Sequence, residues 1–193
     1  MNIAIVGATG NVGRKILEVL EKKELSFDNL HLVASSKSVG KKIIFKGKEY
    51  EISNLENFDF SKVKIAFFSA GGKVAEKFAE KAAKNCLVID NSSYYRMDLE
   101  VPLIVPQVNS EALNNMKKNI IANPNCSTAQ LVIALKPLHD LFTIKRVVVS
   151  TYQSVSGGGK APMDELIDQT KLVLNNKKIK SVNFTKQIAF NVI

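Results

Sequence analysis

The stretch Gly7-Ala8-Thr9-Gly10-Asn11-Val12-Gly13 decides the fold of this 193-residue chain. Residues 2–6 before it, which are apolar from Ile3 onward, predict a short buried strand, and the apolar spacing of residues 16–20 after it predicts a helix. Glycines in a strand–turn–helix unit leave backbone N–H groups bare, so that a pyrophosphate can approach them at the helix N-terminus. The spacing is GxxGxxG rather than the commoner GxGxxG. An ordinary glycine-rich connection is the alternative. We favour a dinucleotide-binding turn made by Gly7, Thr9, Gly10, Asn11, Val12 and Gly13.

The pattern beyond this turn predicts an α/β protein with a Rossmann-like, doubly wound parallel sheet. Further buried strands are expected at residues 30–34, 64–68 and 87–90, with a helix through residues 74–82. Residues 43–52, centred on Lys46-Gly47-Lys48, are typical of a β-hairpin.

The pattern changes near residue 126. A long helix is followed by a β-branched run at residues 146–152, which predicts a strand, and by a helix at about residues 162–174. We expect a Rossmann-like dinucleotide-binding domain at residues 1–126 and the start of a second α+β domain with a mixed sheet at residues 127–193. That second domain is expected to be truncated, since the chain ends directly after an apolar segment.

The end of the second strand indicates which dinucleotide is bound. An NAD site usually carries a carboxylate there, about twenty residues beyond the glycines, to hold the ribose 2′-hydroxyl. This chain instead has Ser35, Ser36, Lys37 and Ser38, whose hydroxyl and ammonium groups suit a 2′-phosphate. These groups could also belong to an ordinary polar surface loop, but we expect that they bind NADP. Ser69, Gly71 and Gly72 follow a later strand and are expected to line the same crevice.

Cys126 lies in Asn123-Pro124-Asn125-Cys126-Ser127-Thr128, directly ahead of an apolar helical run. A thiol in the first turn of a helix faces unpaired N–H groups and the positive end of the helix dipole, which favour the thiolate. A nicotinamide cofactor and an activated cysteine together imply oxidation of an aldehyde through a thioester.

Four motifs then resemble the aspartate-semialdehyde dehydrogenase family, and the resemblance extends over all 193 residues. They are the glycine turn, Asn91-Ser92-Ser93 with Arg96, the segment around Cys126, and Ser150-Thr151-Tyr152-Gln153-Ser154-Val155-Ser156-Gly157. The resemblance implies the reversible, NADP-dependent and phosphate-dependent interconversion of L-aspartate-4-semialdehyde and 4-phospho-L-aspartate. It places this reaction in lysine and diaminopimelate, threonine and methionine biosynthesis.

The resemblance also implies a role for each matching residue. Cys126 is the acyl-thioester nucleophile, and Gln153 is a catalytic residue that orients the substrate. Arg96 and Asn125 bind phosphate, and Ser156 and Gly157 join the cofactor site. The family's general base, a histidine, and a substrate-binding arginine belong to a segment beyond residue 193. The resemblance further implies a homodimer in the full-length form.

Two alternatives stay open at this point. An N-acetyl-γ-glutamyl-phosphate reductase shares the fold and chemistry, but its Pro-Gly-Cys-Tyr-Pro type motif differs from Asn125-Cys126-Ser127-Thr128. A non-catalytic NADP-binding module made by truncation would bind cofactor without turnover.

Composition and charge indicate which classes of binding partner to expect. The charge is +9, but the lysines are scattered and no aromatic-basic stretch or zinc spacing accompanies them, so we expect no nucleic-acid partner and no metal. The N-terminus shows no signal peptide or membrane span, and two distant cysteines suit the reducing cytoplasm. We expect Cys86 to be an unreactive residue of the core. Asp164 and Glu165 are expected to lie exposed to solvent at the start of a helix, and His31 and His139 to lie away from the active site.

Overall fold

The computed structural model describes residues 1–23 and 25–193. By its internal contacts the chain divides into two compact units, Met1–Val149 and Ser150–Ile193. Seven strands, all in the first unit, form one sheet in the order β3-β4-β2-β1-β5-β6-β7. The strands are β1 (Asn2–Val6), β2 (Asn29–Ala34), β3 (Lys42–Phe45), β4 (Lys48–Asn54), β5 (Ile65–Phe68), β6 (Leu87–Asp90) and β7 (Ile120–Ala122).

Six of these strands pair in parallel, which confirms the predicted Rossmann-like sheet. The exception is the expected hairpin, in which β3 pairs antiparallel with β4 across a turn at Lys46 and Gly47. Because β1 lies between β2 and β5, the strand order reverses at β1. Ligands of open α/β sheets bind at such a switch point, beyond the carboxyl ends of the strands.

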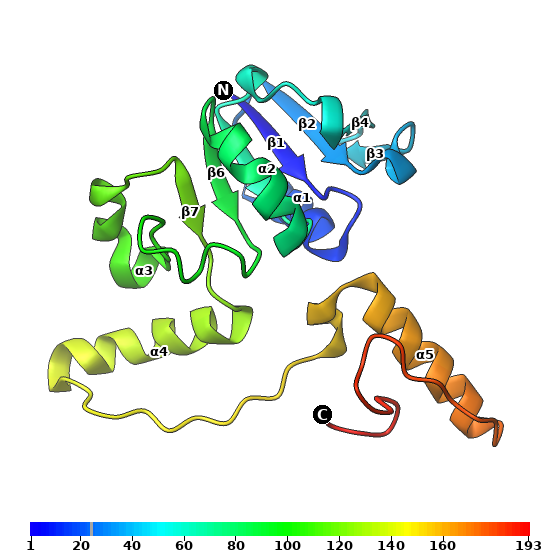
Figure 1. Ribbon diagram of the computed structural model, residues 1–193. Coiled ribbons are helices and arrows are strands. Elements are labelled where there is room, and N and C mark those ends of the chain that lie inside the picture. Colours follow the sequence, from blue (N-terminus) through cyan, green and yellow to red (C-terminus); the bar gives the residue numbers. More distant parts are fainter. Residues whose placement is uncertain (24) are drawn as a thin grey trace. The chain divides into compact units, whose positions relative to one another are not determined.

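Helices α1 (Asn11–Lys22) and α2 (Gly72–Ala83) cover opposite faces of the sheet, with α2 in front and α1 behind (Figure 1). Successive side chains of a strand point to opposite faces. Ile3 and Ile5 of β1 accordingly pack in the cluster that includes Leu17 of α1. Ala4 and Val6 pack in the cluster that includes Phe78 of α2. The continuous apolar run of residues 3–6 therefore contributes to a core layer on each face of the sheet, and the glycine turn follows directly.

The remaining helices are α3 (Pro106–Asn109), α4 (Cys126–Phe142) and α5 (Lys160–Leu174), with α5 in the second unit. The predicted helix at residues 162–174 is confirmed and begins two residues earlier. The strand predicted at residues 146–152 is wrong for this chain, because that segment is irregular and its valines Val147, Val148 and Val149 are half or more exposed. A strand needs a neighbouring backbone to exchange hydrogen bonds with, whatever its side-chain propensity. None of the described residues 150–193 forms a strand.

The reading of Glu165 as solvated is also wrong. Only 9% of Glu165 is exposed, and its carboxylate accepts hydrogen bonds from the backbone of Val182 and Asn183. Asp164, its neighbour, does lie at the surface and pairs with Lys160.

Candidate active site

The glycine turn between β1 and α1 is too tight for side chains at two of its positions. Gly7 has a φ of +89°, and a Cβ there would lie 2.9 Å from the backbone of Ser69. A Cβ on Gly13 would lie 2.3 Å from the carbonyl oxygen of Gly7, so only glycine lets α1 start this close to β1. Gly10 caps α1 without a side-chain hydrogen bond. The first-turn N–H groups of a helix lack intrahelical partners, so this cradle fits a pyrophosphate.

The loop after β2 borders this turn. Residues Ser36–Ser38 form a 3-10 turn, and the hydroxyl of Ser38 lies 3.5 Å from the hydroxyl of Thr9. Ser35, Ser36 and Lys37 are exposed. The structure therefore brings the hydroxyl of Ser38 to the edge of the glycine cradle, and Ser35, Ser36 and Lys37 belong to the same short loop.

The loop after β5 lies on the other side of the cradle. The hydroxyl of Ser69 donates to the carbonyl of Val6 at 2.9 Å, and Gly71, with a φ of +88°, precedes α2. A Cβ on Gly72 would meet Tyr94 and Ser93 at 3.9 and 4.0 Å. This loop thus connects the cradle to the segment that follows β6.

Arg96 belongs to that segment and is fixed by backbone carbonyls. Its Nε donates to the carbonyl of Asn123 at 2.9 Å, and its Nη2 donates to the carbonyl of Asn91 at 3.3 Å. The carboxylate of Asp90, the last residue of β6, is buried and accepts hydrogen bonds from the backbone N–H and the hydroxyl of Ser92. Burial raises the pKa of Asp90, while Ser92 and the charge of Arg96 act in the opposite direction. Arg96 is thus held at the carboxyl edge between β6 and β7.

Cys126 is the first residue of α4, as predicted, and its side chain is exposed. Asn125 caps the helix, because its Oδ1 accepts from the backbone N–H of Ser127 at 3.0 Å and from the Ser127 hydroxyl at 2.6 Å. The Cys126 thiol lies 3.8 Å from the same oxygen. The thiol and the cap therefore follow β7 by four residues or fewer, at the edge of the sheet that also carries Arg96.

Gln153, Ser156 and Gly157 belong to the second unit, which is described separately. A Cβ on Gly157 would lie 2.0 Å from Nε2 of Gln153, so the absence of a side chain there is what lets the Gln153 amide occupy its position. Ser156 donates from its backbone N–H to the Ser154 hydroxyl at 3.3 Å. The participation of these three residues in the site stays a prediction.

Two further side chains belong to this edge, Asn91 and Asn123, which the sequence patterns place in two motifs without giving them a role. Asn91 and Asn123 bond to each other, Nδ2 of Asn123 to Oδ1 of Asn91, at 2.7 Å. Each residue comes directly after a buried parallel strand, a position that could have marked both as residues of the carboxyl edge.

Neither histidine joins this site. His31 lies within β2, with its ring edge-on to Phe58 at 5.6 Å, and burial, followed by the nearby charge of Lys62, lowers its pKa. His139 is exposed near the end of α4.

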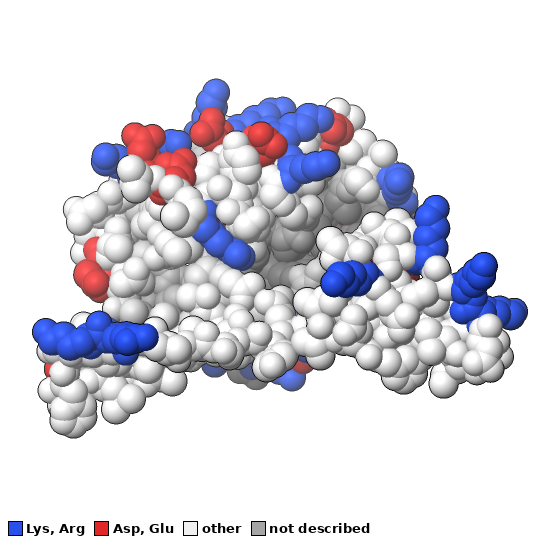
Figure 2. All heavy atoms as spheres, turned by 60° about the horizontal axis from the view of Figure 1, so that its bottom comes forward, with Lys and Arg blue, Asp and Glu red and all other residues white. Residues whose placement is uncertain are grey.

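The described part of the chain shows no cluster of three or more His, Cys, Asp or Glu able to hold a metal, and no helix long and apolar enough to span a membrane. Figure 2 shows Lys and Arg in several separate groups on one face, with acidic residues beside some of them.

The sequence of this chain matches two family models and several known proteins. The family model for the NAD binding domain of semialdehyde dehydrogenase matches residues 2–116, and the model for its dimerisation domain matches residues 135–193. Aspartate-semialdehyde dehydrogenase 2 of Vibrio cholerae serotype O1 is 52% identical over 100% of this chain and 58% of its own length. The chain thus spans under two thirds of this relative.

Solved structures agree with this similarity. The crystal structure of aspartate semialdehyde dehydrogenase II from Vibrio cholerae, complexed with ASA, matches with a TM-score of 0.93 and 51% identity, over 98% of this chain and 57% of that one. An aspartate semialdehyde dehydrogenase with NADP from Candida albicans matches with a TM-score of 0.62 and 29% identity, over 74% of this chain and 48% of that one.

Proposed function

Because the chain belongs to the aspartate-semialdehyde dehydrogenase family, we propose that it carries the cofactor-binding and nucleophile part of such an enzyme. The proposed reaction interconverts L-aspartate-4-semialdehyde and 4-phospho-L-aspartate, with NADP and inorganic phosphate. The observation that carries this proposal is the position of Cys126. Its exposed thiol begins α4 at the strand edge that also holds the glycine cradle and Arg96.

The chemistry follows from the residues at this edge. The nicotinamide ring, when bound, supplies the hydride acceptor or donor. In the oxidative direction the sulfur of Cys126 bonds to the aldehyde carbon, and loss of hydride from that carbon leaves a thioester. An oxygen of phosphate then displaces the sulfur and releases the thiolate. Arg96 and Asn125 are proposed to hold the phosphate, for which the guanidinium fork is suited, and Gln153 to orient the substrate.

The cofactor is proposed to be NADP rather than NAD. The family model supports a nicotinamide cofactor, and the loop of Ser35, Ser36, Lys37 and Ser38 carries hydroxyls and an ammonium where an NAD site has a carboxylate. Thr9, Gly10, Asn11, Val12, Ser69, Gly71, Gly72, Ser156 and Gly157 complete the proposed cofactor site. Replacing Lys37 by Gln should weaken NADPH binding, measured by nucleotide fluorescence, and leave NADH binding unchanged. An equal loss for both nucleotides would refute the 2′-phosphate role.

The wider biology is proposed on the same basis. The match of residues 135–193 to a dimerisation domain supports a homodimer of the full-length protein, and the two free cysteines suit a reducing cytoplasm. We propose a role in lysine and diaminopimelate, threonine and methionine biosynthesis, and keep the domain boundary at residue 126.

The decisive assay follows NADPH formation from NADP, phosphate and L-aspartate-4-semialdehyde. We expect phosphate-dependent turnover in the full-length protein and its loss in Cys126→Ala. Activity that survives Cys126→Ala would refute the nucleophile assignment. If the 193-residue chain binds NADPH without turnover, the binding-module alternative holds for this polypeptide. The reductase alternative predicts activity with N-acetylglutamate semialdehyde instead.

A further inference from the structure

Side-chain hydrogen bonds join the ends of three neighbouring strands, β5, β6 and β7, at the proposed phosphate site. Nδ2 of Asn91, after β6, donates to the carbonyl of Phe68 at the end of β5, at 3.2 Å. Nδ2 of Asn123, after β7, donates to Oδ1 of Asn91 at 2.7 Å. The two amides thus form a relay from β5 to β7, which we call the carboxamide clasp.

The orientation of this clasp is determined by its chemistry. The carbonyl of Phe68 can only accept, so the NH₂ group of Asn91 has to face it. The oxygen of Asn91 therefore faces Asn123, whose NH₂ group meets it. Both amides have a single satisfactory orientation.

The clasp and Arg96 share the same two residues. The guanidinium donates to the backbone carbonyls of Asn91 and Asn123, the residues whose side chains bond to each other. Asn91, Asn123 and Arg96 therefore form a closed hydrogen-bonded ring. Two of the five guanidinium N–H groups are used, and no ion pair of Arg96 occurs within residues 1–23 and 25–193.

The clasp is not needed to pair the strands. The backbone already continues the ladder, because Asn91 N–H donates to the Phe68 carbonyl at 2.9 Å and Asn123 N–H donates to the Asp90 carbonyl at 2.8 Å. The additional side-chain bonds fix the peptide planes whose carbonyls hold Arg96. Asn123 is also three residues before Cys126, so the same short segment carries the anchor of Arg96 and the thiol.

We propose that Asn91 and Asn123 are positioning residues, whose clasp aims the remaining N–H groups of Arg96 at an oxyanion beside Cys126. This rests on the proposed function, in which that oxyanion is phosphate. The clasp acts through Arg96 and touches no substrate itself.

The test uses the Nε–H signals of arginine in the ¹⁵N-labelled chain, which has only Arg14, Arg96 and Arg146. Asn123→Leu and Asn91→Leu break the clasp from either side, so one folded variant suffices. Asn119→Leu is the matched control, because Asn119 precedes β7 and loses one comparable bond, to Ala83, at the other end of the strand. Arg14, which donates to Thr9, serves as an internal reference.

We expect the Nε–H of Arg96 to exchange about fivefold faster in either clasp variant, the factor for loss of an ordinary hydrogen bond. Arg14, and Arg96 in Asn119→Leu, should not change. The double variant should exchange no faster than the single ones, because the two residues act as one unit. Equal Arg96 exchange in Asn123→Leu, Asn91→Leu and Asn119→Leu overturns the clasp.

The second measurement titrates inorganic phosphate and follows the Arg96 signal. A rise of about fivefold or more in the half-saturating phosphate concentration of the clasp variants, and not of Asn119→Leu, supports positioning for an oxyanion. An unchanged half-saturation overturns it. If phosphate leaves the wild-type Arg96 signal unmoved, the proposed phosphate site is wrong, and the exchange rates still decide whether the clasp holds Arg96.

Discussion

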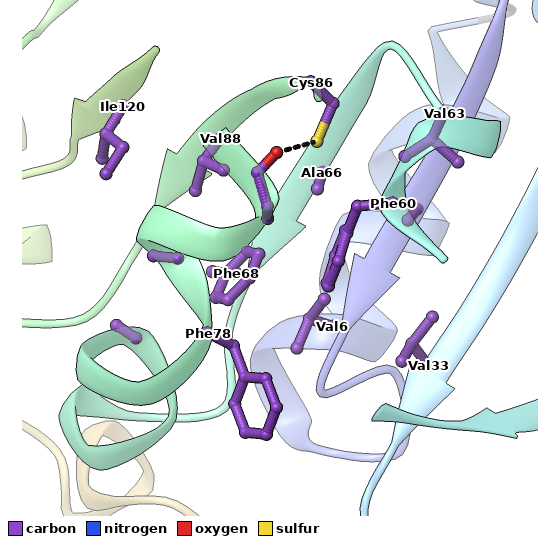
Figure 3. Close-up of a cluster of buried hydrophobic side chains, with 14 of the residues drawn as sticks. Val6, Val33, Phe60, Val63, Ala66, Phe68, Phe78, Cys86, Val88 and Ile120 are labelled. Atoms are coloured by element: carbon purple, nitrogen blue, oxygen red, sulfur yellow. Dashed lines mark hydrogen bonds between the residues drawn. The ribbon is translucent and has the colours of Figure 1, made fainter. Parts of the chain in front are cut away.

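The two cysteines of this chain occupy opposite environments. Cys86 is 5% exposed, and its thiol donates to the carbonyl of Ala82 at 3.4 Å, among the core side chains around Val88 and Ala66 (Figure 3). Burial raises its pKa to about 11. Cys126 lies exposed at the start of α4. Because the thiolate is the reactive form, position in the fold separates two chemically identical side chains.

Alkylation should therefore be selective for Cys126. With a pKa of about 11, roughly one Cys86 side chain in a thousand is a thiolate at pH 8, and it is also shielded from reagent. We expect iodoacetamide to label Cys126 at least about tenfold faster, measured by peptide mass spectrometry. In urea both cysteines should react at similar rates. Equal labelling of the two in the folded chain would contradict the core position of Cys86.

Gly13 is the residue of the cradle least able to carry a side chain. A Cβ there meets backbone atoms of Gly7 and Ala8 at 2.3 and 2.8 Å, and these cannot rotate away. Gly13→Ala should lower the free energy of unfolding by about 1–3 kcal/mol, the usual cost of overpacking. Urea unfolding followed by circular dichroism measures it. Gly72→Ala, whose Cβ has only ordinary contacts from 3.9 Å outward, is the matched control and should leave stability nearly unchanged.

At the scale of elements, the sequence predicted what depends on neighbours close in the chain. Short apolar runs located β1, β2, β5 and β6, and Cys126 was placed correctly because turn residues followed by an apolar run mark a helix start. The prediction of a strand at residues 146–152 was wrong because propensity does not reveal whether a partner backbone is present. The prediction that Glu165 is solvated was wrong because its hydrogen-bond partners, Val182 and Asn183, lie seventeen and eighteen residues away in the sequence. The clasp of Asn91 and Asn123 likewise joins two strand ends that only the sheet order brings together.

The Glu165 carboxylate joins helix α5 to the segment at residues 182–183 by accepting hydrogen bonds from its backbone. Burial acts to raise the pKa of Glu165, but hydrogen bonds from Val182, Asn183 and Gln169 together outweigh it and hold the pKa below its ordinary 4.5. A lowered pKa in the folded state means that the carboxylate stabilises the fold above pH 4.5. This contribution is lost as the pH falls through the lowered pKa.

Glu165→Gln should consequently expose the amides of Val182 and Asn183. We expect their hydrogen-exchange protection, corrected for intrinsic rates, to be at least about tenfold lower than in wild type at pH 7, because a hydrogen bond to a charged group contributes about 1.5–3 kcal/mol. Wild-type protection should fall below pH 4.5, whereas the variant should show no such fall. Asp164→Asn, at the exposed neighbouring carboxylate, is the control. Wild-type protection that stays constant down to pH 3 would refute the role of the carboxylate.

At the scale of the whole chain, the two units differ in how they are held together. The two apolar clusters of the first unit draw their members from residues 3–122 only. In the second unit a buried polar side chain ties the helix to the chain after it, because Gln169, 1% exposed, accepts from the backbone of the buried residues Ile188 and Ala189. The exposed, irregular segment around Arg146 lies next to the border at Val149 and Ser150. The chain should therefore be cleavable there without loss of the first unit's core.

An arginine-specific protease tests this, since the chain has three arginines in three different settings. Arg14 lies in α1, and Arg96 is tied to two backbone carbonyls, whereas Arg146 lies in exposed irregular chain. A protease needs an extended substrate segment, so cleavage should begin after Arg146 and give fragments 1–146 and 147–193, seen by mass spectrometry. Arg146→Gln should remove these early products. The 1–146 fragment should keep a cooperative thermal transition, because all residues of both clusters remain in it. First cleavage after Arg14 or Arg96, or a 1–146 fragment without such a transition, would show that the border of the first unit lies elsewhere.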